Sequence, residues 1–351
     1  MHDTASRRRF LRSTAAALAG SGLLGFPMLP WAQQKKLVIN TYGGRWEKFW
    51  RGELLPPFAK QTSIDTTLDV GLGRNFIANL RAAGVNNPPY SVLMINENLA
   101  NILRSEGYFE SIPEAKVPNL AQVYPNLRNP ENNGVRGIIS PIGIGYRKDL
   151  VKNPPTAWAD LWTNPEFKGK IGLYQIANTA GMLFLLLTAK IFGGSQDAVD
   201  IAFREIKKLQ PFAQVDFSGS LTTLLQRGDV TVGMIDLPEI VALKRKGVPV
   251  EMVIPKEGVV AFEQSFNILK NGPAKEEAYR YINYILDPGV QESMAKEFFT
   301  SPSNTRSKVP PELAADIPVA GDKMSTLVQF DWTRANARST EITERWNREM
   351  K

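Results

Sequence analysis

Short hydrophobic runs alternate with helical patterns along most of this chain, and this alternation restricts the fold more than any other feature. The apolar run at residues 37–39 ends at a pair of glycines, and Trp46 and Trp50 then fall on one face of a helix. The same order of strand and helix signals returns in residues 64–106 and 171–254. Such alternation is typical of a mostly parallel sheet covered by helices on both faces, so the sequence predicts an α/β fold.

Two extended runs, residues 137–147 and 259–270, are longer than an average strand. We interpret them as crossings, on which the chain leaves a first lobe and later returns to it, so that the two crossings form a hinge. A chain of 351 residues is also longer than one hydrophobic core usually serves. The predicted boundaries are residues 33–140 and 262–315 for lobe 1, and residues 141–261 and 316–351 for lobe 2.

The N-terminus has the features of an export signal. Residues 6–12 read Ser-Arg-Arg-Arg-Phe-Leu-Arg, and an Ala-, Gly- and Leu-rich stretch follows at residues 14–25. The order of residues resembles the twin-arginine signal, which implies a signal peptide over residues 1–32, cleavage after Ala32 and a periplasmic protein. The alternative is a basic membrane anchor that is retained.

Cysteine and histidine are almost missing from the sequence, which removes whole classes of chemistry. There is no cysteine, and the single histidine is His2, inside the predicted signal. A cysteine nucleophile, a serine–histidine hydrolase and a histidine- or thiolate-bound metal are therefore excluded from the mature chain. We expect no cofactor, no metal and no enzymatic activity. Although the net charge is +7, the basic residues form no long run, so we expect no nucleic-acid binding.

Four motifs resemble those of the spermidine/putrescine-type (family 1) extracellular solute-binding proteins. They are Trp-Ala-Asp-Leu-Trp at 158–162, Asn-Pro-Glu-Phe-Lys-Gly-Lys-Ile at 164–171, Gly-Asp-Val-Thr-Val-Gly-Met at 228–234 and Pro-Lys-Glu-Gly at 255–258. The resemblance implies the two-lobe periplasmic-binding-protein fold of type II and the soluble receptor of an ABC importer. It also implies a monomer that delivers a small molecule to a membrane permease. Trp158, Leu161 and Trp162 have helical spacing, which favours packing into a core over ligand contact.

Ligands of two-lobe α/β proteins bind at the carboxyl ends of strands, and this rule selects the candidate residues. Tyr42 lies where the resemblance places an aromatic against the ligand's alkyl chain. Several candidates have an alternative structural role: the glycines could only form a turn, Arg45 could face water, Asn178 could cap a helix, and Asp236 could cap the helix that follows it. The candidates after the predicted strands are Tyr42, Gly43, Gly44, Arg45, Asn96, Gln175, Asn178, Thr179 and Asp236.

The second crossing contributes Phe262, Glu263 and Gln264, and Asn304 is a further polar candidate. On the resemblance, Gln264 occupies the position of the family's ammonium-binding aspartate. Because a polyamine carries several charges that are costly to desolvate without carboxylates, the ligand is expected to be an amine-bearing organic anion. The alternatives are a true polyamine receptor, a secreted enzyme that uses carboxylates, and a receptor coupled to a membrane sensor.

Overall fold

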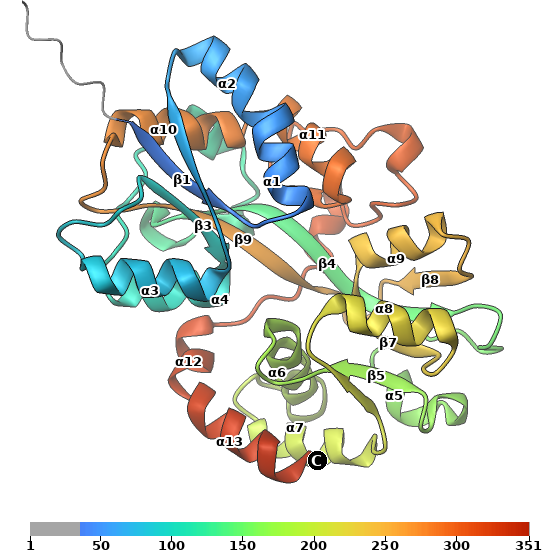
Figure 1. Ribbon diagram of the computed structural model, residues 1–351. Helices are drawn as coiled ribbons and strands as arrows, with labels where there is room; N and C mark the ends of the chain where they lie inside the picture. Colours follow the sequence, from blue (N-terminus) through green and yellow to red (C-terminus); the bar gives the residue numbers. More distant parts are fainter. Residues whose placement is uncertain (1–35, 351) are drawn as a thin grey trace, which may run out of the picture. The chain divides into compact units, whose positions relative to one another are not determined.

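The computed structural model describes residues 36–350, so the predicted signal over residues 1–32, and the alternative anchor, lie outside the described residues. Residues 36–350 belong to one compact unit, drawn in colour in Figure 1. None of the helices in the described range is long and apolar enough to cross a membrane. The fold combines a large sheet with helices, as predicted.

The sheet is mixed rather than mostly parallel. Its strand order is β2-β1-β3-β9-β4-β7-β5-β6, with β8 and β10 also paired to β4. Pairs at the two ends of this order are parallel, whereas β9 and β4 pair antiparallel with all their neighbours. The prediction of a mostly parallel sheet was wrong at its centre, because the chain runs out along β4 and back along β9. The strands are β1 (Leu37–Thr41), β2 (Thr66–Val70), β3 (Val92–Asn96), β4 (Val135–Arg147), β5 (Ile171–Tyr174), β6 (Ala213–Val215), β7 (Val232–Asp236), β8 (Val250–Val253), β9 (Val260–Ile268) and β10 (Ser301–Pro302).

Helices follow most of the strands and flank the sheet in Figure 1. Gly44, with φ +70° and ψ −125°, turns the chain from β1 into the first of them, a conformation that favours glycine. The helices are α1 (Arg45–Phe49), α2 (Leu55–Thr62), α3 (Gly73–Ala83), α4 (Glu97–Ser105), α5 (Asp160–Thr163), α6 (Thr179–Gly193), α7 (Val199–Lys208), α8 (Ser218–Arg227), α9 (Leu237–Arg245), α10 (Lys275–Ile285), α11 (Pro288–Phe298), α12 (Trp332–Ala337) and α13 (Ser339–Glu349), with a π-helical turn at Trp50–Leu54.

Strand β4 changes its partners along its 13 residues. It pairs with β9 from Val135 to Ile142, and with β7 from Ile142 to Tyr146. On the other edge, β10 pairs only with Ile138 and Ile139. Pro141 lies at the changeover, and it has no N–H to donate to either neighbour.

The buried side chains form two large clusters at the two ends of this arrangement. The first core cluster draws its residues from positions 37–139 and 259–327, with Trp50 and Phe266 among its largest members. The second core cluster draws its residues from positions 142–260 and 328–350, with Trp158 and Phe184 among its largest. Both cores therefore depend on chain segments that are distant in the sequence.

The tryptophan motif packs into the second core cluster, as predicted. Trp158 is fully buried, and its Nε1 donates to the carbonyl oxygen of Gly258 at 2.8 Å. The backbone N–H of Trp158 also donates to the Glu257 carboxylate at 3.0 Å. Gly258 adopts φ +98°, and a Cβ there would come within 2.3 Å of the Thr326 carbonyl oxygen. The two distant motifs therefore form one structural unit that anchors the start of β9.

Candidate functional site

A cavity of about 760 Å³ lies at the carboxyl ends of β1, β3 and β7. Its floor includes side chains of β4 and β9, the two strands that connect both core clusters. It is lined by Tyr42, Arg45, Trp46, Leu72, Gly73, Arg74, Asn96, Leu99, Ile138, Ser140, Ala177, Asn178, Thr179, Ser218, Asp236, Pro238, Glu239, Phe262, Gln264, Phe298 and Thr300.

Eight of the residues selected from the sequence meet around this cavity. They come from five separate parts of the chain, four of which were selected by the rule of strand ends and the fifth from the second crossing. The eight are Tyr42, Arg45, Asn96, Asn178, Thr179, Asp236, Phe262 and Gln264.

Five selected residues do not line the cavity. Gly43 and Gly44 form the turn into α1, and Gln175 borders a separate hollow beside Trp346. The buried Asn304 donates from Nδ2 to the Leu286 carbonyl oxygen at 2.7 Å.

Glu263 is the fifth, and its position follows from strand geometry. Side chains alternate between the two faces of a strand, so Phe262 and Gln264 face the cavity while Glu263 does not. The buried Glu263 carboxylate instead lies 3.4 Å from Arg136 Nε and accepts from Gln329 Nε2 at 2.6 Å. Burial raises the pKa of Glu263, and the nearby Arg136 opposes that shift.

Aromatic rings form one wall of the cavity. The Tyr42 hydroxyl donates to Gln264 Oε1 at 2.9 Å, and burial raises the pKa of Tyr42, so the phenol stays protonated. Trp46 lies edge-on to Tyr42, with ring centroids 5.5 Å apart, and stacks on Phe298 at 4.4 Å. Such a wall can contact the apolar portion of a ligand or the face of a cation.

Two carboxylates lie on the side of the cavity formed by α8 and α9. Asp236 is buried, and its Oδ1 accepts from the Ser218 hydroxyl at 2.8 Å and from the Tyr174 hydroxyl at 3.4 Å. Glu239, in the first turn of α9, makes no hydrogen bond or ion pair with any other residue between 36 and 350. Burial raises the pKa of Asp236, and burial together with the charge of Asp236 raises that of Glu239. Neither acid forms an ion pair within residues 36–350, although the charges of Lys246 and Arg45 partly oppose the rise in the pKa of Glu239.

Two arginines lie on the side formed by α1 and α3. Arg45 is engaged, because its Nε lies 2.5 Å from Glu297 Oε1 and its guanidinium covers the rings of Phe298 and Phe299. Arg74 lines the cavity in the first turn of α3 and has no hydrogen bond or ion pair within the described part of the chain. The guanidinium of Arg74 is therefore the basic group that is free to bind an anion.

Arg74, Ser218 and Glu239 were not selected from the sequence. Arg74 is the second residue of α3, and Glu239 is the third residue of α9. Extending the search by one helical turn beyond each strand end would have found both. Ser218 follows β6, a strand that the hydrophobic pattern did not predict.

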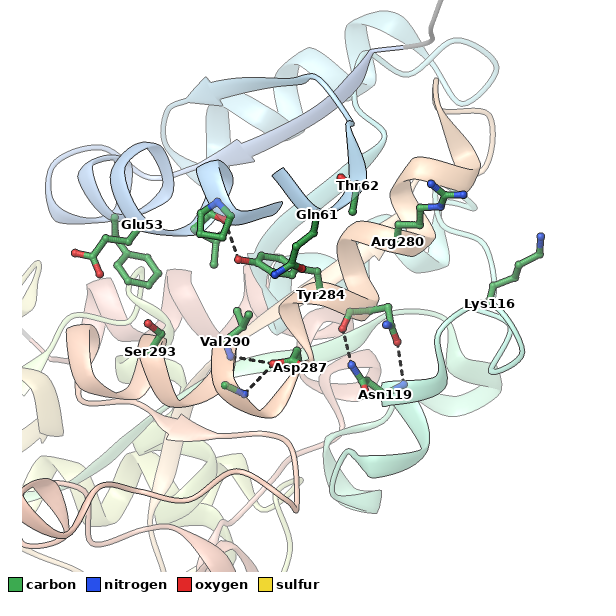
Figure 2. A pocket seen from close by; sticks show the side chains of 15 residues that line it. Glu53, Gln61, Thr62, Lys116, Asn119, Arg280, Tyr284, Asp287, Val290 and Ser293 are labelled. Atoms are coloured by element: carbon green, nitrogen blue, oxygen red, sulfur yellow. Dashed lines mark hydrogen bonds between the residues drawn. The ribbon is translucent and has the colours of Figure 1, made fainter. Parts of the chain in front are cut away.

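A second hollow of about 510 Å³ lies beside α2, α10 and α11, and some of its polar groups are paired with one another or with the backbone. Figure 2 shows the Tyr284 hydroxyl bonded to the Leu54 carbonyl, Asn119 bonded to Asn283, and Asp287 capping the start of α11. Glu53, Gln61, Arg280 and Ser293 also line it without a side-chain hydrogen bond or ion pair in residues 36–350, but no residue of a strand end reaches this hollow. Within residues 36–350, no group of three or more His, Cys, Asp or Glu side chains is arranged to hold a metal ion.

Comparison with known proteins relates the chain to solute receptors. The family model described as bacterial extracellular solute-binding protein matches residues 87–321. The spermidine/putrescine-binding periplasmic protein of Escherichia coli (strain K12) is 27% identical over 326 residues, covering 89% of this chain and 92% of the relative. The gamma-aminobutyric acid-binding protein of Pseudomonas aeruginosa is 23% identical over 337 residues, covering 92% of this chain and 93% of the relative.

Among solved structures, an ABC transporter protein from Clostridium perfringens ATCC 13124 superposes with a TM-score of 0.81. It is 25% identical, and the alignment covers 90% of this chain and all of the other. The sheet order and helix placement described above are therefore those of a known class of structures.

Proposed function

The chain belongs to the family of bacterial extracellular solute-binding proteins, and on this premise we propose that it is the receptor of an ABC importer for a small amine-bearing organic anion. The ligand would bind without covalent chemistry, cofactor or metal in the 760 Å³ cavity. Binding would be the whole activity, with no catalytic step.

One observation carries the ligand class: free groups of opposite charge lie on different sides of the same cavity. Among the described residues, neither Asp236 nor Glu239 forms an ion pair with a cation, and Arg74 forms none with an anion. A ligand ammonium near the two acids would compensate the cost of keeping buried carboxylates charged. A ligand acid near Arg74 would gain a charge-assisted hydrogen bond.

A polyamine receptor is the second candidate, and the paired acids favour it. Putrescine or spermidine would satisfy Asp236 and Glu239, and the named Escherichia coli relative is a spermidine/putrescine-binding protein. A polyamine would, however, leave Arg74 facing a ligand of its own charge. Gln264 is also neutral where the resemblance expects an aspartate.

The closing motion would occur between the lobes predicted from the sequence, at residues 33–140 with 262–315 and residues 141–261 with 316–351. The separation of the two large core clusters supports this division. Val319 and Met324 belong to the first core cluster, which favours a lobe 1 that extends beyond residue 315. The ligand would act by binding the closed form more tightly than the open one, and the permease would recognise the closed form.

Export would follow the twin-arginine pathway, with cleavage after Ala32 and a monomeric receptor in the periplasm. The pattern of residues 6–12 supports this route, and the curated relative from Escherichia coli is itself a periplasmic protein. A membrane permease would be the partner, in preference to a membrane sensor. Transport by the receptor in vesicles with its permease would separate these two partners.

The test is a titration of purified, ligand-stripped protein. Binding is monitored by calorimetry and by the fluorescence of Trp46, which lines the cavity. The panel should contain gamma-aminobutyric acid, 2-aminoethylphosphonate, putrescine, spermidine and simple dicarboxylates. Two matched variants decide the ligand class. For an amine-bearing anion, Arg74→Gln and Glu239→Gln should each weaken binding by about 10- to 100-fold, the value of a charge-assisted hydrogen bond.

For a polyamine, Glu239→Gln should weaken binding while Arg74→Gln strengthens it. Arg81→Gln is the control on the same helix, because Arg81 pairs with Glu106 and does not line the cavity. Tight binding of spermidine with the second pattern would contradict the proposed class. Chemical turnover of any compound in the panel would contradict the proposed receptor function.

A further inference from the structure

Two of the large apolar side chains that are exposed in residues 36–350 lie beside the candidate cavity. Leu72 lines the cavity and is 52% exposed, and Phe217 directly precedes the cavity-lining Ser218 and is 61% exposed. The remaining two, Leu150 and Phe192, lie away from the cavity lining. Single exposed apolar residues are common, but these two occupy related positions on opposite sides of one cavity.

The two residues have the same local setting. Leu72 is the extended residue just before α3, and Phe217 is the extended residue just before α8. A cavity-lining polar residue follows each of them closely, namely Arg74 on one side and Ser218 on the other. Both therefore lie where the cavity wall meets the surface.

The Phe217 ring is held at this place by its neighbours. A Cβ on Gly219 would come within 2.7 Å of the ring, so the ring lies directly over the first turn of α8. The preceding carbonyl, that of Asp216, accepts a hydrogen bond from Asn178 Nδ2 at 2.9 Å, and Asn178 also lines the cavity. The ring is exposed, but its backbone is fixed to the cavity wall.

Within residues 36–350, no hydrogen bond joins α1 or α3, on one side of the cavity, to α8 or α9, on the other. The side-chain bonds of lining residues stay on one side, as in Tyr42 with Gln264 and Ser218 with Asp236. An approach of the two walls would bring Leu72 toward Phe217 and remove both apolar surfaces from water. It would also exclude water from Arg74 and from the acids, which strengthens ionic contacts to a ligand.

We propose that Leu72 and Phe217 are two apolar lips that close against each other over the bound solute and set its affinity. This inference rests on the proposed function for its ligand, but the contact between the lips can be tested without a ligand. The lips add affinity through water exclusion and through their own contact, whichever charged solute lies beneath them.

The first experiment measures the coupling between the lips with gamma-aminobutyric acid as the probe. Leu72→Ala and Phe217→Ala should each weaken binding by about 5- to 30-fold, and the double variant should weaken it about fivefold less than the product of the two. Leu150→Ala and Phe192→Ala are matched controls with 47% and 37% exposed side chains, and they should leave affinity within twofold.

The second experiment uses the absence of cysteine from the sequence. The double variant Leu72→Cys with Phe217→Cys should form an intramolecular disulfide under mild oxidation, and a bound solute should accelerate it. The pair Leu72→Cys with Leu150→Cys is the control and should form none at a comparable rate. Spontaneous closure is sufficient for this readout, so it does not require the correct ligand.

The outcomes separate the two proposals. If a solute binds but the two cysteines do not cross-link preferentially and the two alanine substitutions are not coupled, the proposed contact between Leu72 and Phe217 is wrong. The proposed receptor function is unaffected by that result. Preferential cross-linking when none of the tested solutes binds supports the lips and counts against the proposed ligand class. Cross-linking that a solute accelerates supports both.

Discussion

The hydroxyl of Ser218 donates a hydrogen bond to Oδ1 of Asp236 at 2.8 Å, from a helix start to a strand end 18 residues later in the chain. Together with the Tyr174 hydroxyl, it gives a buried carboxylate two neutral donors and no cation. Neutral donors orient the carboxylate and leave its charge uncompensated. The chemistry of the site therefore depends on the protonation of this acid and of its neighbour Glu239.

Ligand affinity should fall as the pH is lowered, and at a higher pH than ordinary carboxyl groups would cause. The pKa of Asp236 and that of Glu239 are raised above their usual values of 3.8 and 4.5, mainly by burial. An ammonium ligand needs both groups ionised, so affinity is complete above the raised pKa values and is lost as pH falls through them. Calorimetric titration from pH 8 to pH 4 would measure this.

The free energy of unfolding of the unliganded protein should show the opposite pH dependence. An acid whose pKa is raised by folding stabilises the folded state below its unfolded pKa, and that stability is lost as pH rises through the folded pKa. Glu239→Gln should weaken the pH dependence of both the ligand affinity and the free energy of unfolding. An affinity that stays constant down to pH 4 would exclude the two acids from the ligand contact.

Glu97→Gln should cost about 3 kcal/mol of unfolding free energy. Glu97 is buried, and its carboxylate lies 2.9 Å from Arg104 and 3.7 Å from Arg136. The substitution leaves two poorly solvated guanidinium groups with Glu263 as their remaining carboxylate, and breaking a buried pair is strongly destabilising. Glu47→Gln, which breaks the exposed pair with Arg51, should cost less than about 0.5 kcal/mol. Chemical denaturation of both variants would test the contrast.

Gly181→Ala should destabilise the protein by about 1–3 kcal/mol, the usual cost of overpacking. A Cβ at position 181 would lie 2.1 Å from the carbonyl oxygen of Gln175, at the turn that carries Asn178 and Thr179 to the cavity. Ligand binding should weaken at the same time, because that turn must move. The matched variant Gly52→Ala meets no atom within 4 Å, and a thermal melt that ranks the two variants equally would contradict the argument.

Tyr281→Phe should cost about 1–3 kcal/mol of unfolding free energy and leave ligand affinity unchanged. The indole Nε1 of Trp50 donates to the Tyr281 hydroxyl at 2.9 Å, and both side chains are buried in the first core cluster. Removing the hydroxyl leaves that indole N–H without its acceptor in an apolar setting. Equal denaturation midpoints for the variant and the original protein would disprove a stabilising role for this hydrogen bond.

The strand and helix pattern predicted much of the site because strand ends are local features. Tyr42, Asn96 and Asp236 each lie at or just after a strand, and the cavity collects all three. The face of the sheet on which the Glu263 side chain lies could be predicted only from the register of β9 against β4. That register depends on pairing between segments more than 100 residues apart. Arg74 and Glu239 lie one helical turn beyond the strand ends that were searched, in α3 and α9, so the search stopped short of both.

The antiparallel centre of the sheet could not be predicted in the same way. The extended runs at residues 137–147 and 259–270 indicated two crossings, but local composition does not reveal the direction in which strands pair. The structure pairs Ile142 with Val260 on one edge and with Asp236 on the other, which makes β4 common to both halves.

The continuity of β4 and β9 has a consequence for how the polypeptide reaches its final form. The first core cluster includes Leu37 and Val92 from early in the chain, but also Phe266, Met294 and Leu327. A ribosome must therefore deliver most of the protein before its amino-terminal half can bury its own interior. Nascent chains shorter than about 330 residues should stay sensitive to proteases, because neither half can mature ahead of the other.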